Sequence, residues 1–211
     1  MRALGGARVL VRPGSSDAQV LLDTFVGGYH RPPGDLSPMT IVDLGSNIGL
    51  TLADLAARHP RATIVGVELD DGNASLAERN VEAWSDRCTV VRAAVWTEDG
   101  EITYGLTPGR EYAARIGEGG QSTRSTSIDT LTANLPSIDY LKMDIEGAEE
   151  HVLRTNTGWA AKVACIKVET HPPYTRDDCT RDLAALGFTT TLDEHHTRAV
   201  LGRRSGAATY P

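Results

Sequence analysis

Two pairs of residues that can bind ligands or transfer protons follow neighbouring apolar runs of the chain. Asp144 and Glu146 come directly after one run, and Glu169 and His171 come after the next. Because ligands of open α/β sheets bind at the carboxyl ends of the strands, we expect these side chains to converge. An imidazole titrates near about pH 6.5 and can take a proton from an alcohol, so His171 is the predicted general base. Asp144 is predicted to orient cofactor or substrate beside it, and Glu146 and Glu169 to contact the substrate.

Each of these assignments has an alternative. His171 could simply hydrogen-bond the proline turn that follows it, and Asp144 could only cap the next helix. Asp144, Glu169 and His171 also offer oxygen and nitrogen donors that could hold a divalent ion such as Mg²⁺ against a substrate diol. Since no close spacing of ligands requires an ion, the sequence favours catalysis without a metal.

A second chemical signal is the stretch 40–49, which predicts a buried strand running into a turn where a helix begins. The turn consists of small or polar residues that let a ligand approach the backbone at a helix N-terminus, namely Gly45, Ser46, Asn47 and Gly49. Asp43 lies inside the apolar run, where a carboxylate is costly unless a cation or a ring of N–H donors pairs with it. These five residues are predicted to bind a nucleotide-like cofactor, with Asp43 beneath it organising the turn.

The spacing of the turn narrows the choice of cofactor. The dinucleotide pattern G-x-G-x-x-G is absent, because Asn47 stands where a glycine would be needed, and no phosphate-binding G-x-x-x-x-G-K-[ST] occurs. The three lysines, Lys142, Lys162 and Lys167, lie far from the turn in sequence. A cofactor with an adenosine and a charged amino-acid tail but no phosphates fits best, and S-adenosylmethionine is such a molecule.

The next predicted strand, 63–67, ends in an acidic residue that could hold a ribose. Glu68 lies roughly 20 positions after the glycine turn, where nucleoside-binding βαβ units place a carboxylate against the ribose hydroxyls. Glu68 could instead only cap the following helix. Leu69, and Ala94 in the third predicted strand, are assigned to the cofactor site as well.

Strand and helix patterns alternate almost to the end of the chain, which predicts an α/β fold with a mostly parallel sheet. Strands are expected at 40–44, 63–67, 90–95, 138–143 and 163–168, with a closing antiparallel hairpin at about 189–192 and 199–201. Helices are expected at 50–59, 73–84, 146–156 and 176–186. The glycine-rich stretch 106–127 is predicted to be an irregular mobile flap. His195 and His196, in the hairpin turn, are expected to face solvent.

Composition limits the class of protein. The 211 residues, 40% hydrophobic and 23% charged, suit one globular domain over 1–211, with 1–36 as an N-terminal cap in which Tyr29 either closes over the cofactor or packs the first helix. A net charge of −7 argues against a nucleic-acid partner. The three cysteines lack metal spacing and are interpreted as core thiols. We expect no membrane partner and a cytoplasmic location, since neither a signal peptide nor a spanning segment is evident.

The order of several motifs resembles that of FkbM-type S-adenosylmethionine-dependent methyltransferases. The matching segments are RPGSSD at 12–17, GY at 28–29, DLGSNIG at 43–49, SIDTL at 127–131, LKMDIEGAE at 141–149 and VETH at 168–171. The resemblance implies a Rossmann-like class I fold with a seven-stranded sheet, and O-methylation of sugars or secondary metabolites such as antibiotics. The chain departs from the pattern at Thr170, where the family more often has an apolar residue.

The leading hypothesis is therefore a small-molecule O-methyltransferase, and a homodimer is compatible with it. N-methylation of an amino sugar is a close variant. A nicotinamide-dependent dehydrogenase would share the βαβ start and Glu68, but the missing glycine pattern and the lack of a Tyr-x-x-x-Lys pair count against it. A cofactor-binding protein without catalytic activity would need neither Asp144 nor His171.

Overall fold

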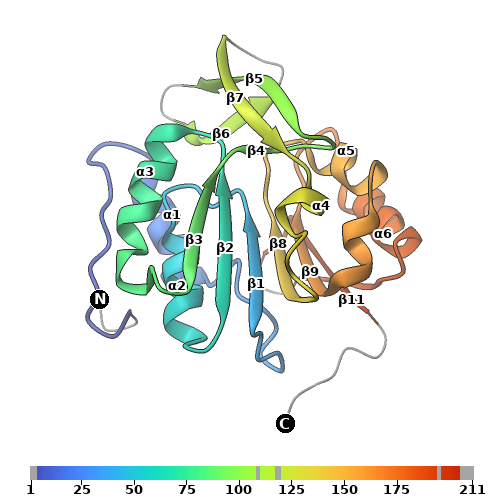
Figure 1. The fold of residues 1–211 in the computed structure, drawn as a ribbon, viewed down its shortest axis with the longest axis horizontal. Coiled ribbons are helices and arrows are strands. Elements are labelled where there is room, and N and C mark those ends of the chain that lie inside the picture. The colour runs from blue at the N-terminus through green and yellow to red at the C-terminus, as the bar shows by residue number, and fades with distance from the viewer. Residues whose placement is uncertain (1–3, 108–109, 117–119, 194–195, 205–211) are drawn as a thin grey trace.

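The computed structural model describes residues 4–107, 110–116, 120–193 and 196–204. In this part of the chain a seven-stranded sheet stands at the centre, in the order β10-β11-β9-β8-β1-β2-β3 (Figure 1). Its strands are β1 (Thr40–Leu44), β2 (Thr63–Glu68), β3 (Cys88–Arg92), β8 (Ile138–Met143), β9 (Val163–Glu169), β10 (Thr189–Leu192) and β11 (Ala199–Arg203). Strands β3, β2, β1, β8 and β9 run parallel, whereas β11 is antiparallel to both β9 and β10. The expected mostly parallel sheet with a closing antiparallel hairpin is confirmed.

Helices connect these strands and pack against the sheet. They are α1 (Asp17–Leu22), which continues as the π-helical turn η2 (Asp23–Gly27), α2 (Leu50–Arg58), α3 (Asp71–Asn80), α4 (Ile128–Leu131), α5 (Glu149–Arg154) and α6 (Arg176–Ala185), with the 3₁₀ turns η3 (Glu82–Trp84) and η4 (Gly158–Lys162). Helix α5 begins three residues later than expected because Glu146 and Gly147 adopt positive φ angles of 55° and 106°. Among the described residues, the helices are too short or too polar to cross a membrane.

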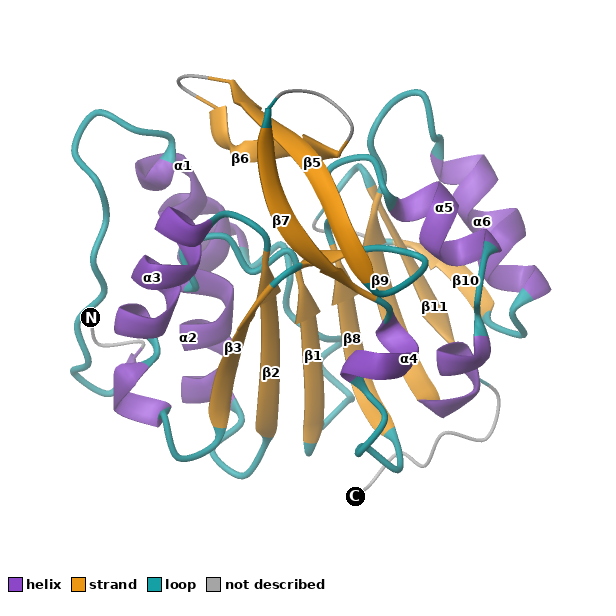
Figure 2. Ribbon diagram, turned by 45° about the horizontal axis from the view of Figure 1, so that its top comes forward, coloured by secondary structure: helices purple, strands orange, loops and turns teal. Residues whose placement is uncertain are grey.

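The expectation that 106–127 is irregular is wrong. This stretch supplies most of a second sheet, in the order β4-β7-β5-β6, built from β4 (Ala94–Val95), β5 (Gly100–Thr107), β6 (Arg110–Ile116) and β7 (Gln121–Thr126). The predicted strand 90–95 is accordingly divided between the two sheets. Figure 2 shows the second sheet lying across the carboxyl ends of the central strands. Its strand β7 contains no apolar residue, so local hydrophobicity does not reveal this pairing. That the segment moves as a flap stays a prediction.

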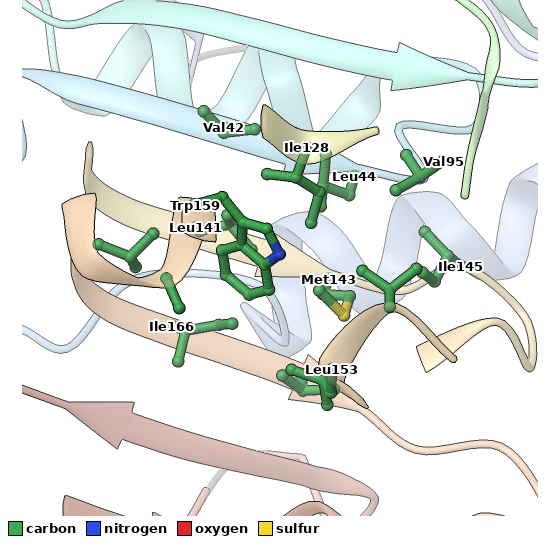
Figure 3. Close-up of a cluster of buried hydrophobic side chains, with 14 of the residues drawn as sticks. Val42, Leu44, Val95, Ile128, Leu141, Met143, Ile145, Leu153, Trp159 and Ile166 are labelled. Carbon is green, nitrogen blue, oxygen red and sulfur yellow. The ribbon is translucent and has the colours of Figure 1, made fainter. Parts of the chain in front are cut away.

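Alternating side chains of the central sheet build two cores, one on each face. On one face, Val42 and Leu44 of β1 join Leu141, Ile166 and residues from α4, α5, α6 and η4, with Trp159 buried in the middle (Figure 3). On the other face, Ile41 packs with residues of α2, β2 and β3. Because successive residues of a strand point to opposite faces, Asp43 lies on the same face as Ile41.

Charged residues occupy the α2 face of three adjacent strands. Asp43 of β1 is in register with Lys142 of β8, which is in register with Lys167 of β9. Lys142 Nζ lies 3.0 Å from Asp43 Oδ1, and Lys167 Nζ lies 2.7 Å from Asp193 Oδ2. All four side chains are at least nine-tenths buried, so each charge depends on its partner.

We expect Lys142→Met to destabilise the protein by about 3–5 kcal/mol, because it leaves the Asp43 carboxylate buried without its cation. Urea unfolding followed by circular dichroism measures the change. The double variant Asp43→Asn/Lys142→Met should recover part of the loss, and the exposed substitution Arg61→Met is the matched control. A Lys142→Met loss below about 1 kcal/mol would contradict the dependence of this charge on its partner.

Candidate functional site

A pocket of about 750 Å³ opens at the carboxyl edge of the central sheet. Its wall comes from α1, from the turn after β1, from the end of β2, and from the segments that follow β8, β9 and β10. Of the predicted site residues, the lining includes Tyr29, Gly45, Ser46, Asn47, Glu68, Leu69, Asp144, Glu146, Glu169 and His171. The volume lies in the usual range for small-molecule sites, roughly 300–1,000 Å³.

The turn after β1 is where two strand ends meet. Gly45 has a φ of 82°, and a Cβ built on it would lie 1.7 Å from the carbonyl oxygen of Asp144. The backbone N–H groups of Gly45 and Ser46 both donate to the carbonyl of Val67, at 3.0 and 2.9 Å. A side chain at Gly45 would therefore push apart the ends of β1 and β8, rather than only enter the path of a ligand.

Two predicted cofactor residues of the stretch 40–49 do not line the pocket. Gly49 packs helix α2 against α3, since a Cβ there would lie 2.8 Å from Ala77 Cα. Asp43 lies beneath the turn and is paired with Lys142, whose Nζ also donates to the carbonyl of Gly45 at 2.6 Å. Sequence reasoning set Lys142 aside because it is distant along the chain. The available signal was a lysine and an aspartate, each inside an apolar run predicted to be a strand.

The end of β2 carries the residue assigned to the ribose. Glu68 is buried, and its two carboxylate oxygens accept the N–H groups of Asn47 at 2.8 Å and Asp70 at 3.0 Å. Burial raises the pKa of Glu68 to about 7, and these N–H groups partly oppose that effect. Asp70, not Glu68, caps helix α3 by accepting from the N–H of Asn73. Glu68 thus bridges the two loops at the pocket and fits a nucleoside cofactor, because its remaining lone pairs can accept hydroxyl protons.

The other two predicted cofactor residues, Leu69 and Ala94, differ in whether they line the pocket. Leu69 lines the pocket, and its carbonyl accepts from the Thr123 hydroxyl of the second sheet at 3.3 Å. Ala94 does not line it. Its neighbours Ala93 and Val95 do, because side chains alternate along this short extended segment and Ala94 faces the opposite way.

The structure brings together the four acidic and imidazole side chains that follow β8 and β9. His171 Nε2 lies 3.4 Å from Glu146 Oε2, 3.7 Å from Glu169 Oε1 and 3.8 Å from Asp144 Oδ1. Burial and the Asp144 carboxylate raise the pKa of Glu146 to about 8. Burial acts in the same direction on Asp144, but the Lys142 cation and the neighbouring imidazoles together outweigh it and hold the pKa of Asp144 below its usual value.

Glu149, to which the sequence analysis gave no role, is fully buried and holds His171. Its Oε1 lies 2.9 Å from His171 Nδ1, and its carboxylate also accepts the N–H groups of Ile145 and Gly147. Burial alone would lower the pKa of His171, but the bond to Glu149 and the surrounding carboxylates raise it to about 9. The orientation leaves Nε2 facing the pocket.

Two further histidines join the site. His196 does not face solvent as expected: it is buried, and its Nε2 lies 2.9 Å from Glu169 Oε2. His195 lies outside the described residues. His30, which sequence reasoning missed, lines the pocket with Nε2 3.8 Å from Asp144 Oδ2. Burial and the nearby Lys142 cation lower the pKa of His30 to about 3, so this imidazole is neutral.

The predicted metal ligands do not form one set. Among the described residues, donor atoms cluster as His30, Asp144 and Glu169, and as Asp144, Glu149 and His171, with Asp144 in both. Glu169 is already paired with His196 and Arg198, and His171 Nδ1 with Glu149. Because protein cations and imidazoles take up these donors, the arrangement does not call for an ion, and catalysis without a metal stays a prediction.

Comparison with known proteins agrees with these features. The model of the Methyltransferase FkbM domain matches residues 43–200. No curated protein sequence matches the chain.

Solved structures, among them methyltransferases, share the fold. A precorrin-6y C5,15-methyltransferase from Geobacter metallireducens GS-15 superposes with a TM-score of 0.54 at 11% identity, covering 95% of each chain. A fibrillarin pre-rRNA processing protein from Methanococcus jannaschii gives 0.55 at 12% identity, over 96% of this chain and 84% of the other. An O-methyltransferase family protein from Burkholderia thailandensis gives 0.54 at 14% identity, over 90% and 58%. At these identities the likeness concerns the fold alone.

Gly45→Ala should weaken S-adenosylmethionine binding by at least about tenfold, because the added Cβ collides with the Asp144 carbonyl and displaces the turn. Isothermal titration calorimetry measures the affinity. Gly34→Ala, with no atom within 4 Å of the added Cβ, is the matched control. Unchanged affinity in the folded Gly45→Ala variant would remove the turn from the cofactor site.

The imidazole of His171 should titrate near pH 9 in NMR spectra of histidine Cε1–H groups. Since its folded pKa exceeds the unfolded value of about 6.5, its contribution to stability is full below that pH and is lost as pH rises through about 9. Glu149→Gln should lower the midpoint, whereas Glu150→Gln, which removes a carboxylate paired with Arg154, should not. A midpoint near pH 6.5 in the wild-type protein would contradict this electrostatic arrangement.

Proposed function

The chain belongs to the FkbM methyltransferase family, and from this premise we propose that it transfers a methyl group from S-adenosylmethionine to a hydroxyl of a small molecule. A sugar or another secondary metabolite is the proposed acceptor class. The observation that carries the proposal is the joining, in one pocket, of a nucleoside-binding turn with a cluster of carboxylates and imidazoles. A hydroxyl must lose its proton as it is methylated, and such a cluster can accept it.

The cofactor half of the pocket is built by β1, β2 and the turns after them. Glu68 would accept the ribose hydroxyls, and the backbone of Gly45 and Ser46 would lie against the amino-acid tail. Lys142 holds this region together by binding the carbonyl of Gly45 and the carboxylate of Asp43. When bound, the sulfonium supplies the methyl group.

The proposed general base is His171, with Asp144 orienting the reacting groups. The raised pKa of His171 keeps its imidazole protonated at neutral pH. A positive charge beside Nε2 disfavours the imidazolium, so filling the pocket with a cationic ligand favours release of that proton. The neutral ring can then accept the proton of a hydroxyl, while Glu149 fixes its orientation. Reaction also needs the hydroxyl oxygen within about 3–3.5 Å of the methyl carbon.

The methylated atom, the cellular location, the partners and the oligomeric state are also proposals. N-methylation of an amino sugar would use the same pocket without a base for a hydroxyl proton. We further propose a cytoplasmic enzyme with a small-molecule acceptor, no nucleic-acid partner and a possible dimeric state, based on the net charge of −7 and the composition. A nicotinamide-dependent dehydrogenase is set aside because the family match is to a methyltransferase.

The test is transfer of labelled methyl groups to candidate hydroxyl acceptors, with products identified by a mass increase of about 14 Da for each added CH₂. His171→Ala should lower the rate by about 10² to 10⁴-fold with cofactor affinity retained, as expected for loss of a general base. EDTA should leave the rate unchanged. Methylation confined to nitrogen would contradict the proposed acceptor. A fully active His171→Ala variant would assign the base to another group, and a loss with EDTA that Mg²⁺ restores would overturn catalysis without a metal.

A further inference from the structure

One wall of the pocket is formed by a segment that precedes the matched domain. Three consecutive carbonyl groups in this segment accept hydrogen bonds from side chains of the central sheet. Lys167 Nζ donates to the carbonyls of Tyr29 at 3.0 Å and Arg31 at 2.8 Å, and the Tyr140 hydroxyl donates to that of His30 at 2.9 Å. Since the matched domain covers 43–200, the family match does not itself assign a role to this wall.

These contacts fix the imidazole of His30 in the pocket. Lys167 is anchored in turn by Asp193. The His196 ring lies 4.7 Å from the Tyr29 ring and 5.8 Å from the His30 ring. The His30 side chain is 16% exposed and faces Asp144. Residues held in this way by buried neighbours form a preorganised binding surface.

The groups that meet beside His30 are hydrogen-bond acceptors. Asp144 Oδ1 is buried and has no hydrogen-bond partner in the described structure. Glu146 points its carboxylate into the same space from a backbone with positive φ. The neutral imidazole of His30 adds a ring nitrogen that can accept.

Cations of the protein leave these acceptors free to accept further hydrogen bonds. Lys142 lies 3.6 Å from Asp144 Oδ2, but its shorter contacts are to Asp43 and the carbonyl of Gly45, and Arg198 is engaged by Glu169. His171 is turned toward the cluster, yet its single Nε2–H faces carboxylates of Asp144, Glu146 and Glu169 at 3.4–3.8 Å. One donor cannot saturate three carboxylates.

We propose that the acceptor carries a protonated amine close to the methylated hydroxyl, and that Asp144, Glu146 and His30 bind this ammonium group. The inference rests on the proposed transfer to a hydroxyl. An ammonium group offers three donors and no acceptor, and its charge favours the ionised form of Glu146, so it complements two carboxylates and a neutral imidazole. Its hydrogen bonds to carboxylates are charge-assisted and therefore stronger than those of a neutral hydroxyl. The cofactor carries only one net positive charge, so it does not offset all the carboxylates of the pocket.

The test compares three probes of similar size and different charge: glucosamine, glucose and glucuronate. Each is titrated by calorimetry into the full-length protein saturated with S-adenosylhomocysteine, at pH 7 and with EDTA present so that no divalent ion replaces the amine. Glucosamine should bind at least about tenfold more tightly than glucose, and glucuronate more weakly than glucose. Equal affinities, tighter binding of glucuronate, or binding of none of the probes would overturn the proposal.

Variants assign the preference to particular side chains. Glu146→Gln and His30→Phe should each reduce the preference for glucosamine over glucose by several-fold, while Glu82→Gln, on an exposed turn, should leave it unchanged. Affinity for S-adenosylhomocysteine and the melting temperature show that each variant is folded. A preference that both pocket variants retain would overturn the assigned residues.

The ammonium site and the proposed transfer to oxygen can each fail while the other stands. If glucosamine is preferred but its methylation product carries the methyl group on nitrogen, the ammonium site stands and transfer to oxygen fails. If a neutral polyol is methylated on oxygen and the amine gives no advantage, transfer to oxygen stands and the ammonium site fails.

Discussion

The ion pair between Asp43 and Lys142 is the interaction on which the site depends. It joins adjacent strands at the level where both end, and it lies beneath the turn that begins at Gly45. Lys142 also binds the carbonyl of Gly45 and lies 3.6 Å from Asp144 Oδ2, so one buried cation holds together the cofactor turn and the acidic cluster. Burial of this pair is tolerable only because both charges find partners in the same place.

This arrangement gives the two imidazoles beside Asp144 opposite pKa shifts. Two imidazoles approach its carboxylate from opposite sides, and burial acts to lower the pKa of both. For His171 the carboxylates of Glu149 and its neighbours outweigh burial, whereas for His30 the Lys142 cation adds to it. At neutral pH the imidazole of His171 is therefore protonated and that of His30 is neutral. Such a separation of protonation states within one site is a common basis for distinct chemical roles.

The common methyltransferase fold explains the position of the pocket but not its selectivity. The central sheet places the turn after β1 and the acids after β8 and β9 at one edge, as open α/β sheets do. The remaining wall comes from the segment around His30, from α1 and from residues 196–198. Buried Lys167 and Tyr140 bind the backbone of the first of these, which makes the wall part of the folded core. Differences in acceptor between proteins of this fold can therefore arise outside the shared sheet.

The sequence alone determined the central sheet and the family, and most of the site residues that it predicted line the pocket. Apolar periodicity and the spacing of glycines and acids are local properties, so the strands at 138–143 and 189–192, the turn at Gly45 and the position of Glu68 could be read directly. The sequence also showed that Asp43 needs a partner. Only the tertiary structure identified that partner as Lys142, because it depends on which strands are neighbours and in what register. The same holds for His30 and Glu149, and for the second sheet, whose polar strand β7 is defined by pairing rather than by apolar pattern. Contacts between residues distant in the chain are set by packing of the whole domain, and single-chain periodicity contains no direct record of them.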